Sequence, residues 1–311
     1  MINQCEPRSG RPNAGSTQAA RERTRLINVA YRLLGSVAEA EDAVQETYAR
    51  WHAMTLEQQQ AIATPAAWLT TVASRICLDL LGSARVRRER YVGEWLPEPL
   101  PEPAEWVGER RDTSTVDPAD RITLDESINM AFLVVLDAMT PAERVAFILH
   151  DVFRYSFAEV AEIVGRTPAA CRQLASTARR RTRAARAPAS ATARQARIVR
   201  DFKRAWESKD INALIGLLDP DATAVADGGG LASAYPHPLH GAERVARAYL
   251  AFASAAPVRT ILERTVNGSP GLISQLDGVT VTVWAFAIEG ERIKHIWAMR
   301  NPDKLQPWTT T

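Results

Sequence analysis

Apolar residues recur every three or four positions over much of the chain, which is the spacing that lines one face of an α-helix. The first series covers Leu26–Leu34, a second helix is predicted from Val37, and Pro65 begins a third. They predict an all-helical domain over residues 19–91. The segment 1–18 before it is rich in Gly, Pro, Asn and Ser, so we expect it to be disordered.

A proline-rich stretch separates this domain from a second helical one. Residues 92–121 lose helical periodicity and contain five prolines, which predicts a linker of extended backbone. Helical spacing resumes over residues 122–186, where Thr140, Ser156 and Thr167 each precede a predicted helix as capping residues. A short turn with glycine lies between the last two helices. Two helices joined in this way predict a helix-turn-helix.

The last third of the chain changes from helical spacing to alternation. Val279–Ile288 alternates, Glu289-Gly290-Glu291 supplies a turn, and Arg292–Arg300 returns, which predicts a β-hairpin. Amphipathic helical segments precede this hairpin. The predicted fold is therefore multidomain, with two all-α modules followed by an α+β cone over residues 196–311, joined to them by a linker over residues 187–195.

Composition narrows the class of protein. The chain has 311 residues, of which 46% are hydrophobic, enough for several packed cores. It has no run of roughly 18 to 20 apolar residues and no apolar segment near its start, so we expect a cytoplasmic protein without a membrane partner. Its cysteines, Cys5, Cys77 and Cys171, form no CxxC pair, so we predict neither a disulfide framework nor a metal or cofactor site.

Charge is unevenly distributed although the net charge is only +2. Six arginines and no acidic residue lie between Arg172 and Arg186. Helical phase places Cys171, Ala175 and Ala178 inward and leaves a basic face outward, which is either a solvated helix end or a DNA-reading surface, because arginine pairs with guanine and phosphate and glutamine with adenine. The predicted DNA-contacting residues are Arg172, Gln173, Ser176, Arg179, Arg180, Arg181 and Arg183.

Both helical modules resemble one family. Residues 40–48 (AEDAVQETY) look like sigma region 2.2, and residues 65–75 followed by Asp79 are similar to regions 2.3 and 2.4. Residues 156–183 resemble region 4.2. In this order the segments identify the chain as a member of the extracytoplasmic-function (ECF) sigma factors of the sigma-70 family. One departure is Gly82, where many members carry arginine.

The resemblance implies partners and roles. The acidic helix face, otherwise a solvated surface, would bind core RNA polymerase through Glu41, Asp42, Gln45 and Glu46. The first domain would recognise the −10 element of promoter DNA, with the polar stretch 54–64 as a loop that holds an extruded base. Phosphates would be gripped by Arg85, Arg87 and Arg88. The second domain would read the −35 element in the major groove, and the chain itself is not expected to be an enzyme.

The C-terminal third is similar to the SnoaL-like group of the NTF2-like superfamily over residues 194–307. Three segments look like motifs of the SigJ-type sigma factors that carry such a domain. They are Trp95-Leu96-Pro97-Glu98-Pro99, Asp227-Gly228-Gly229-Gly230 and Asn301-Pro302-Asp303-Lys304-Leu305. The resemblance implies that these segments dock the domain on the sigma modules and regulate them in cis. The second motif commonly ends in lysine, where this chain has Leu231.

Other functions of this domain stay open. SnoaL-like relatives include cyclases and isomerases, for which acid–base groups could come from Asp227, Tyr235, His237, His240, Asp277 and His295. A pocket for a small-molecule ligand and a purely structural contact surface are alternatives. So is a helix-turn-helix regulator that needs no polymerase. An anti-sigma partner is not encoded in the chain, and neither its presence nor its absence is predicted.

Overall fold

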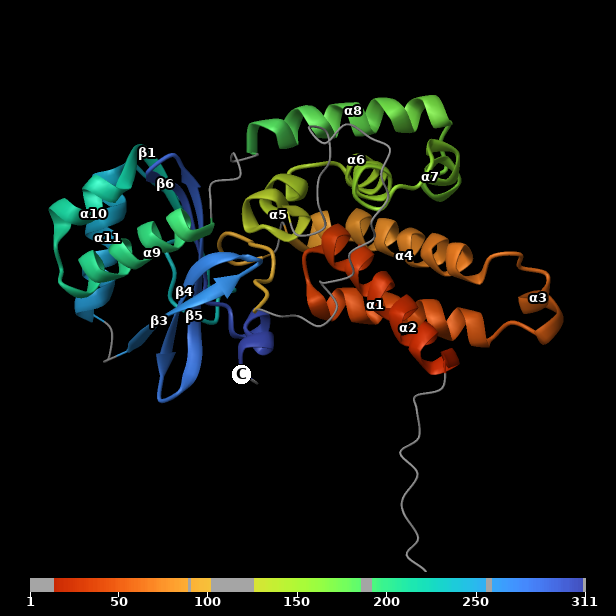
Figure 1. Ribbon diagram of the computed structural model, residues 1–311, viewed down its shortest axis with the longest axis horizontal. Helices are drawn as coiled ribbons and strands as arrows, with labels where there is room; N and C mark the ends of the chain where they lie inside the picture. Colours follow the sequence, from red (N-terminus) through yellow and green to blue (C-terminus); the bar gives the residue numbers. More distant parts are fainter. Residues whose placement is uncertain (1–13, 89–90, 102–125, 186–191, 256–258, 310–311) are drawn as a thin grey trace, which may run out of the picture.

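The structure, a computed structural model, describes residues 14–88, 91–101, 126–185, 192–255 and 259–309 (Figure 1). Two helical domains lie together, and an α+β domain adjoins them. This confirms the predicted order of two all-α modules followed by an α+β module. Within the described ranges, no helix is both long enough and apolar enough to cross a membrane.

The first domain consists of α1 (Ala14–Leu34), α2 (Val37–His52), α3 (Leu56–Gln60) and α4 (Pro65–Arg88). Helix α1 begins inside the segment for which we expected disorder, and residues 1–13 lie outside the described part of the chain. Helix α3 lies in the stretch expected to be a loop, because Thr55 and Gln58 form a capping box that starts a short helix. The apolar faces of α1, α2 and α4 meet in one core.

The second domain follows its predicted capping signals. Its elements are η2 (Glu126–Ile128), α5 (Met130–Asp137), α6 (Pro141–Phe147), the π-helical turn η3 (Ile148–Val152), α7 (Phe157–Val164) and α8 (Pro168–Ala185). Capping boxes at Thr140 and Ser156 start α6 and α7. Gly165 ends α7 with a positive φ of 69°, and Thr167 caps α8 by accepting a hydrogen bond from the N–H of Ala170 (3.2 Å). The helix-turn-helix is thereby confirmed.

The third domain is a mixed sheet packed on helices. In chain order it contains α9 (Thr192–Glu207), α10 (Ile211–Leu217), β1 (Leu218–Asp227), β2 (Leu239–His240), α11 (Ala242–Ala255), β3 (Thr260–Val266), β4 (Ser269–Leu276), β5 (Val279–Glu289), β6 (Arg292–Met299), η4 (Pro302–Lys304) and η5 (Gln306–Trp308). The strand order is β2-β1-β6-β5-β4-β3, in which β1 and β6 are parallel and the other neighbours antiparallel. The predicted hairpin is β5–β6, where Ala285 pairs with Trp297.

Alternation along β5 buries both faces of this sheet. Trp284 and Phe286 point into a core shared with α9, α10 and α11, which lie on the side of the sheet away from the helical domains (Figure 1). Val283 and Ala285 point to the opposite face. There they pack with Met130 of α5 and with Leu96. The sheet therefore has two cores, one inside its own domain and one between domains.

The two helical domains are packed on each other. Helix α4 lies against α6 and α7, and residues of both domains form one hydrophobic core. Arg144 of α6 donates to the carbonyl of Leu33 (2.8 Å), and Arg75 of α4 donates to the carbonyl of Glu162 (2.8 Å). Of the predicted linker, residues 92–101 are described, and residues 96–100 among them are buried, while residues 102–121 lie outside the described ranges.

Candidate functional site

The outward face of α8 carries most of the residues predicted to contact DNA. Cys171, Ala175 and Ala178 are fully buried, which confirms the helical phase assigned from the sequence. The exposed residues are Arg172, Gln173, Ser176, Arg180, Arg181 and Arg183. The guanidinium of Arg172 lies over the ring of Phe157 on α7, 5.3 Å from its centroid. This cation–π contact holds the side chain in place at the start of the predicted reading helix.

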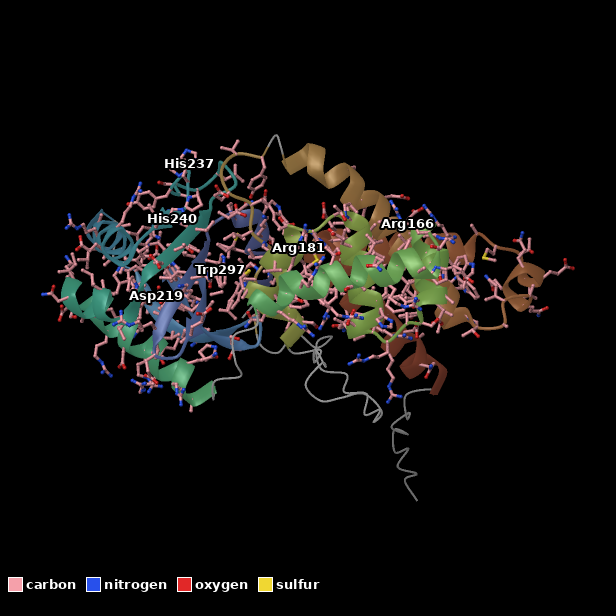
Figure 2. The ribbon with its side chains drawn as sticks, turned by 90° about the horizontal axis from the view of Figure 1, so that it is seen from above. Arg166, Arg181, Asp219, His237, His240 and Trp297 are labelled. Carbon is pink, nitrogen blue, oxygen red and sulfur yellow. The ribbon has the colours of Figure 1, made fainter. Side chains whose placement is uncertain are left out.

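Arg179 and Arg181, both predicted to contact DNA, form ion pairs within their own domain. Arg179 Nε donates to Asp151 Oδ1 (2.6 Å), and Arg181 Nη1 donates to Glu143 Oε2 (3.3 Å). Both acids are nearly buried. The ion pairs fasten α8 to η3 and α6, with Arg181 toward one end of the helix and Arg166 in the turn at the other (Figure 2). Helical periodicity relates only residues of the same helix, so the sequence did not predict these ion pairs between helices.

The residues predicted to bind polymerase share one exposed face of α2. These exposed residues are Glu41, Asp42, Gln45 and Glu46. Ala43 and Val44 between them are buried against the domain core. Glu46 forms an ion pair with Arg50 one turn later (2.8 Å), in which both side chains are about half exposed. Such surface pairs contribute little to stability. Because all four side chains are exposed, this acidic face is accessible to solvent.

The predicted DNA contacts of the first domain lie at the two ends of α4. Arg85, Arg87 and Arg88 fall in its last two turns, where the structure describes the backbone path. The stretch 54–64 precedes its N-terminus and contains α3. With 24 residues in the helix, a rise of about 1.5 Å per residue separates these two regions by roughly 36 Å. They would contact separate parts of a DNA site.

An extended segment, which we call the strap (residues 91–101), lies between the first domain and the α+β domain. Glu98 fixes it to the turn between α1 and α2, because its N–H donates to the carbonyl of Gly35 (2.8 Å) and its carboxylate accepts from the N–H of Val37 (2.8 Å). The hydroxyl of Tyr31 donates to the carbonyl of Glu98 (2.7 Å). Burial raises the pKa of the Glu98 carboxyl to about 7.

One buried carboxylate holds the other side of the strap. Asp227, the last residue of β1, is fully buried. Its Oδ1 accepts from the hydroxyl of Tyr91 (2.6 Å), and its Oδ2 accepts from the N–H of Leu96 (2.9 Å) and from the ammonium of Lys304 (2.7 Å). The same ammonium donates to the carbonyl of Leu96 (2.7 Å) and lies 4.2 Å from the centroid of a Trp95 ring. Two of the predicted motifs thus meet around the third.

Asn301 completes this cluster, which we call the latch (Tyr91, Asp227, Asn301 and Lys304). Its side-chain amide donates to the hydroxyl of Tyr91 (2.8 Å), and its backbone N–H donates to the carbonyl of Asp227 (2.9 Å). Gly229 has a positive φ of 60° and donates its N–H to Asp227 Oδ1 (3.0 Å). A Cβ atom at Gly229 would collide with the Asn301 side chain, so glycine permits the close approach as well as the backbone conformation.

The other motif residues lie around the latch. Leu96 and Leu305 are buried on the outer sheet face, and Pro97 lies against the turn at Gly35. Pro302-Asp303-Lys304 forms η4, with Asn301 as its N-cap. The remaining loop residues are Gly228, Gly230, which lies against Val92, and Leu231, which is exposed. The loop after β1 has leucine where the motif commonly has lysine, and the cation that pairs with Asp227 is instead Lys304 of η4.

Sequence reasoning missed a residue that joins all three domains. Asn267, in the turn between β3 and β4, donates from its side-chain amide to the hydroxyl of Tyr31 (3.0 Å) and to the carbonyl of Ile128 (2.9 Å). Its side-chain oxygen accepts from the N–H of Leu100 in the strap (3.1 Å). The Asn267-Gly268 dipeptide is a hairpin-turn signal, which could have located the turn but not these partners.

The residues considered for acid–base catalysis do not converge. Asp227 lies in the latch, Asp277 lies in the turn between β4 and β5, and His295 of β6 is bonded to the hydroxyl of Thr223 (2.7 Å). Burial lowers the pKa of His295. His237 and His240 are exposed, and Figure 2 shows them apart from Trp297 on the inner part of the domain. Within the described ranges, no group of three His, Cys, Asp or Glu residues could hold a metal ion.

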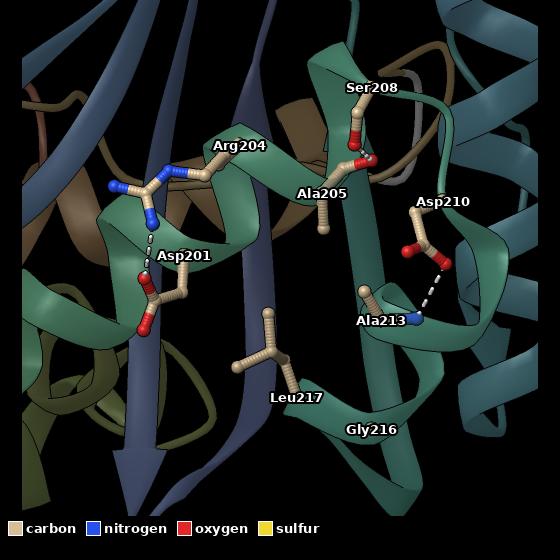
Figure 3. Close-up of a pocket in the computed structure, with 8 residues that line it drawn as sticks. All are labelled: Asp201, Arg204, Ala205, Ser208, Asp210, Ala213, Gly216 and Leu217. Carbon is tan, nitrogen blue, oxygen red and sulfur yellow. Dashed lines mark hydrogen bonds and ion pairs between the residues drawn. The ribbon is translucent and has the colours of Figure 1, made fainter.

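A hollow of about 440 Å³ between α9 and α10 offers little for recognition (Figure 3). Its polar groups are already bonded to one another: Arg204 pairs with Asp201 (3.5 Å), and Asp210 accepts from the N–H of Ala213 (2.9 Å). Ser208 donates to the carbonyl of Ala205 (3.2 Å). Since these groups already serve helix ends and helix surface, the hollow is a groove between helices rather than a binding site.

Comparison with known families places both helical domains. The Sigma-70 region 2 family matches residues 19–87, and the Sigma-70, region 4 family matches residues 129–182. The first match covers α2 and α4, including the acidic face. The second covers the helix-turn-helix and the basic face of α8.

Similarity to individual proteins extends over all three domains. The chain is 36% identical to the ECF RNA polymerase sigma factor SigJ of Mycobacterium tuberculosis over 296 residues, which are 91% of this chain and 90% of that protein. It is 34% identical to a probable ECF RNA polymerase sigma factor, SigI, of the same species over 92% of each chain. The crystal structure of SigJ superposes with a TM-score of 0.71 at 32% identity, over 94% of this chain and 98% of that one.

The buried Glu98 carboxyl predicts a specific pH dependence of stability. Its pKa of about 7, against an ordinary 4.5, means that the folded chain binds this proton more tightly than the unfolded chain. The stabilisation is therefore full below pH 4.5 and is lost as the pH rises through about 7. This pKa difference corresponds to about 3 kcal/mol.

Glu98→Gln should abolish this pH dependence, because the amide oxygen can still accept from Val37 without a charge. Unfolding midpoints in urea, measured from pH 4.5 to 8 for both proteins, should diverge as the pH rises, with the variant more stable at pH 8. Parallel curves would show that Glu98 titrates normally.

Proposed function

This chain belongs to the ECF sigma factors of the sigma-70 family, and on that basis we propose that its C-terminal domain restrains promoter recognition in cis by holding the two promoter-binding domains together. In this proposal the acidic face of α2 docks on core RNA polymerase. The first domain recognises the −10 element and the exposed face of α8 reads the −35 element. The latch and strap control whether both elements can be reached at once.

The direct packing of the two helical domains carries this proposal. The −10 and −35 elements are, by their numbering, about 25 base pairs apart, or roughly 85 Å along B-DNA at 3.4 Å per base pair. Two touching domains of this size have centres only about 30 Å apart. Arg75 of α4 touches the backbone of α7 directly. Recognition of both elements therefore requires the domains to separate.

Contacts of the C-terminal domain with both helical domains support its role in keeping them together. Asn267 bonds to Tyr31 of the first domain and to the backbone of Ile128 in the second. Asn129 of the second domain donates to Ser269 (2.8 Å). The outer sheet face covers Met130 of α5 and Leu96 of the strap. Separation of the helical domains would expose these apolar side chains and break these hydrogen bonds. Both effects cost free energy and therefore favour the closed arrangement.

Breaking the latch should increase promoter-directed transcription. Asp227→Asn removes the carboxylate that pairs with Lys304 in a buried site, a loss that costs about 3 to 5 kcal/mol. A loss of about 3 kcal/mol would raise the open fraction roughly a hundredfold wherever the closed form dominates. Run-off transcription with core polymerase and equal amounts of each protein measures the effect.

Asp219→Asn is the matched control for this experiment, because Asp219 pairs with Lys294 (3.1 Å) on the same domain away from the strap. Removal of the residues after Lys304 provides a second route, since it deletes Trp308, whose indole N–H donates to the carbonyl of Pro99 (2.8 Å). Asp227→Asn and the shortened chain should both give more transcript than the wild type and the control. Equal or lower transcription from either variant in folded form would contradict a restraint.

Substitutions on α8 should separate base reading from phosphate binding. Arg172→Ala or Gln173→Ala should change the preference at one position of the −35 element by about 1 to 3 kcal/mol. Arg183→Ala should weaken all −35 sequences alike. Holoenzyme binding to a panel of promoters with single −35 substitutions distinguishes the two outcomes. An unchanged preference for Arg172→Ala would mean that this face does not read bases.

Charge reversal on α2 should weaken polymerase binding without affecting folding. The double variant Asp42→Lys/Glu46→Lys changes two exposed positions, where charges contribute little to stability but much to association. The double variant Glu207→Lys/Glu243→Lys, at two exposed acids of α9 and α11, changes the net charge by the same amount and serves as the control. Pull-down with core polymerase should show loss for the α2 double variant only. Full retention would mean that this face is simply solvated.

A further inference from the structure

A cavity of about 380 Å³ lies in the C-terminal domain between β1, β6 and α11. Its walls are mostly apolar and include the rings of Tyr249, Phe252 and Trp284. The Phe252 and Trp284 rings are nearly perpendicular, with centroids 6.4 Å apart. This volume lies at the lower end of the range of ligand sites, which is about 300 to 1,000 Å³, and suits a molecule of one or two rings.

Among the residues that line this cavity, Arg300 alone carries a charge. Its guanidinium lies over the Phe252 ring, 5.0 Å from the centroid, and Arg259 lies over the same ring at 5.0 Å. Arg300 Nη1 donates to the carbonyl of Ser233. In the described part of the chain, Arg300 Nε and Arg259 Nε and Nη1 are buried without a hydrogen-bond partner.

The guanidinium groups of Arg259 and Arg300 both lie over the Phe252 ring, and a nearby negative charge would stabilise two positive charges held this close together. Burial lowers the pKa of both arginines, and the charge of Arg259 lowers that of Arg300 further. Within the described ranges, neither Arg259 nor Arg300 forms an ion pair with a carboxylate. The ion pairs of this domain are made by other basic residues, such as Arg200, Lys294 and Lys304. A partly buried charge without a counterion is costly. A ligand that carries the missing charge would offset this cost.

We propose that the cavity binds an aromatic carboxylate. The carboxylate pairs with Arg300, whose planar fork of N–H groups matches its two oxygens. The aromatic body lies against Phe252 and Trp284, whose rings are nearly perpendicular to each other. A cation would be repelled by both arginines, and a neutral aromatic molecule would leave their N–H groups unpaired. This site is independent of the proposed restraint, because it needs only the folded C-terminal domain.

A pair of matched probes tests the charge requirement on the full chain. 1-Naphthaleneacetate and 1-naphthaleneacetamide have the same ring system and differ in the charged group. We expect calorimetric titration to show the acetate binding at least about tenfold more tightly, or about 1.4 kcal/mol. Arg300→Gln should bring the two affinities together, and Arg300→Lys should retain part of the preference. Arg264→Gln, on the exposed edge of β3, should leave both unchanged.

A filled cavity provides a test that does not depend on Arg300. Ala248 of α11 lines the cavity and is nearly buried, so Ala248→Leu should occupy the space and weaken both probes while Arg300 is retained. Failure of the wild type to bind the acetate at millimolar concentration would overturn the proposal. So would equal affinities of the wild type for acetate and amide, whether or not the Arg300 variants fold.

Discussion

A carboxylate removed from water is stable only when donors and positive charge surround it, and Asp227 meets this requirement with groups from distant segments. Tyr91 and Leu96 come from the strap, and Lys304 comes from the turn after the last strand. The removal of any of these segments would leave buried polar groups without partners. The strap, the loop after β1 and the turn after β6 therefore assemble as one unit, and the position of the C-terminal domain depends on that unit.

Directional hydrogen bonds and apolar burial have different roles in this assembly. The outer sheet face supplies burial, which favours contact with the helical domains but fixes no particular orientation. Asn267 and Glu98 supply orientation. Asn267 bonds to the Tyr31 hydroxyl of α1 and to the backbone N–H of Leu100 in the strap, and Glu98 bonds to the backbone N–H of Val37 in α2. A contact that combines moderate apolar area with buried polar groups can be specific and still separable, as a regulated contact between domains must be.

Features coded by neighbouring residues were predictable, and contacts between distant segments were not. The capping box at Ser156, the phase of α8 and the β5–β6 hairpin each follow from residues within one or two turns or strands. The family resemblance located Asp227 and Lys304 as motif residues. It did not show that they bond to each other, and the pairing of Arg179 with Asp151 was missed altogether. Such pairs depend on how helices and sheets pack, which local periodicity does not encode.

The latch also has a consequence for the order of events during synthesis. Lys304 follows the end of α8 at Ala185 by more than 100 residues, which a ribosome adds in roughly 6 to 25 s at 5 to 20 residues per second. Throughout that interval both helical domains are complete while the carboxylate–ammonium pair does not yet exist. Each newly made chain therefore passes through an unlatched period. A message that ends before codon 304 would leave its product in that condition permanently.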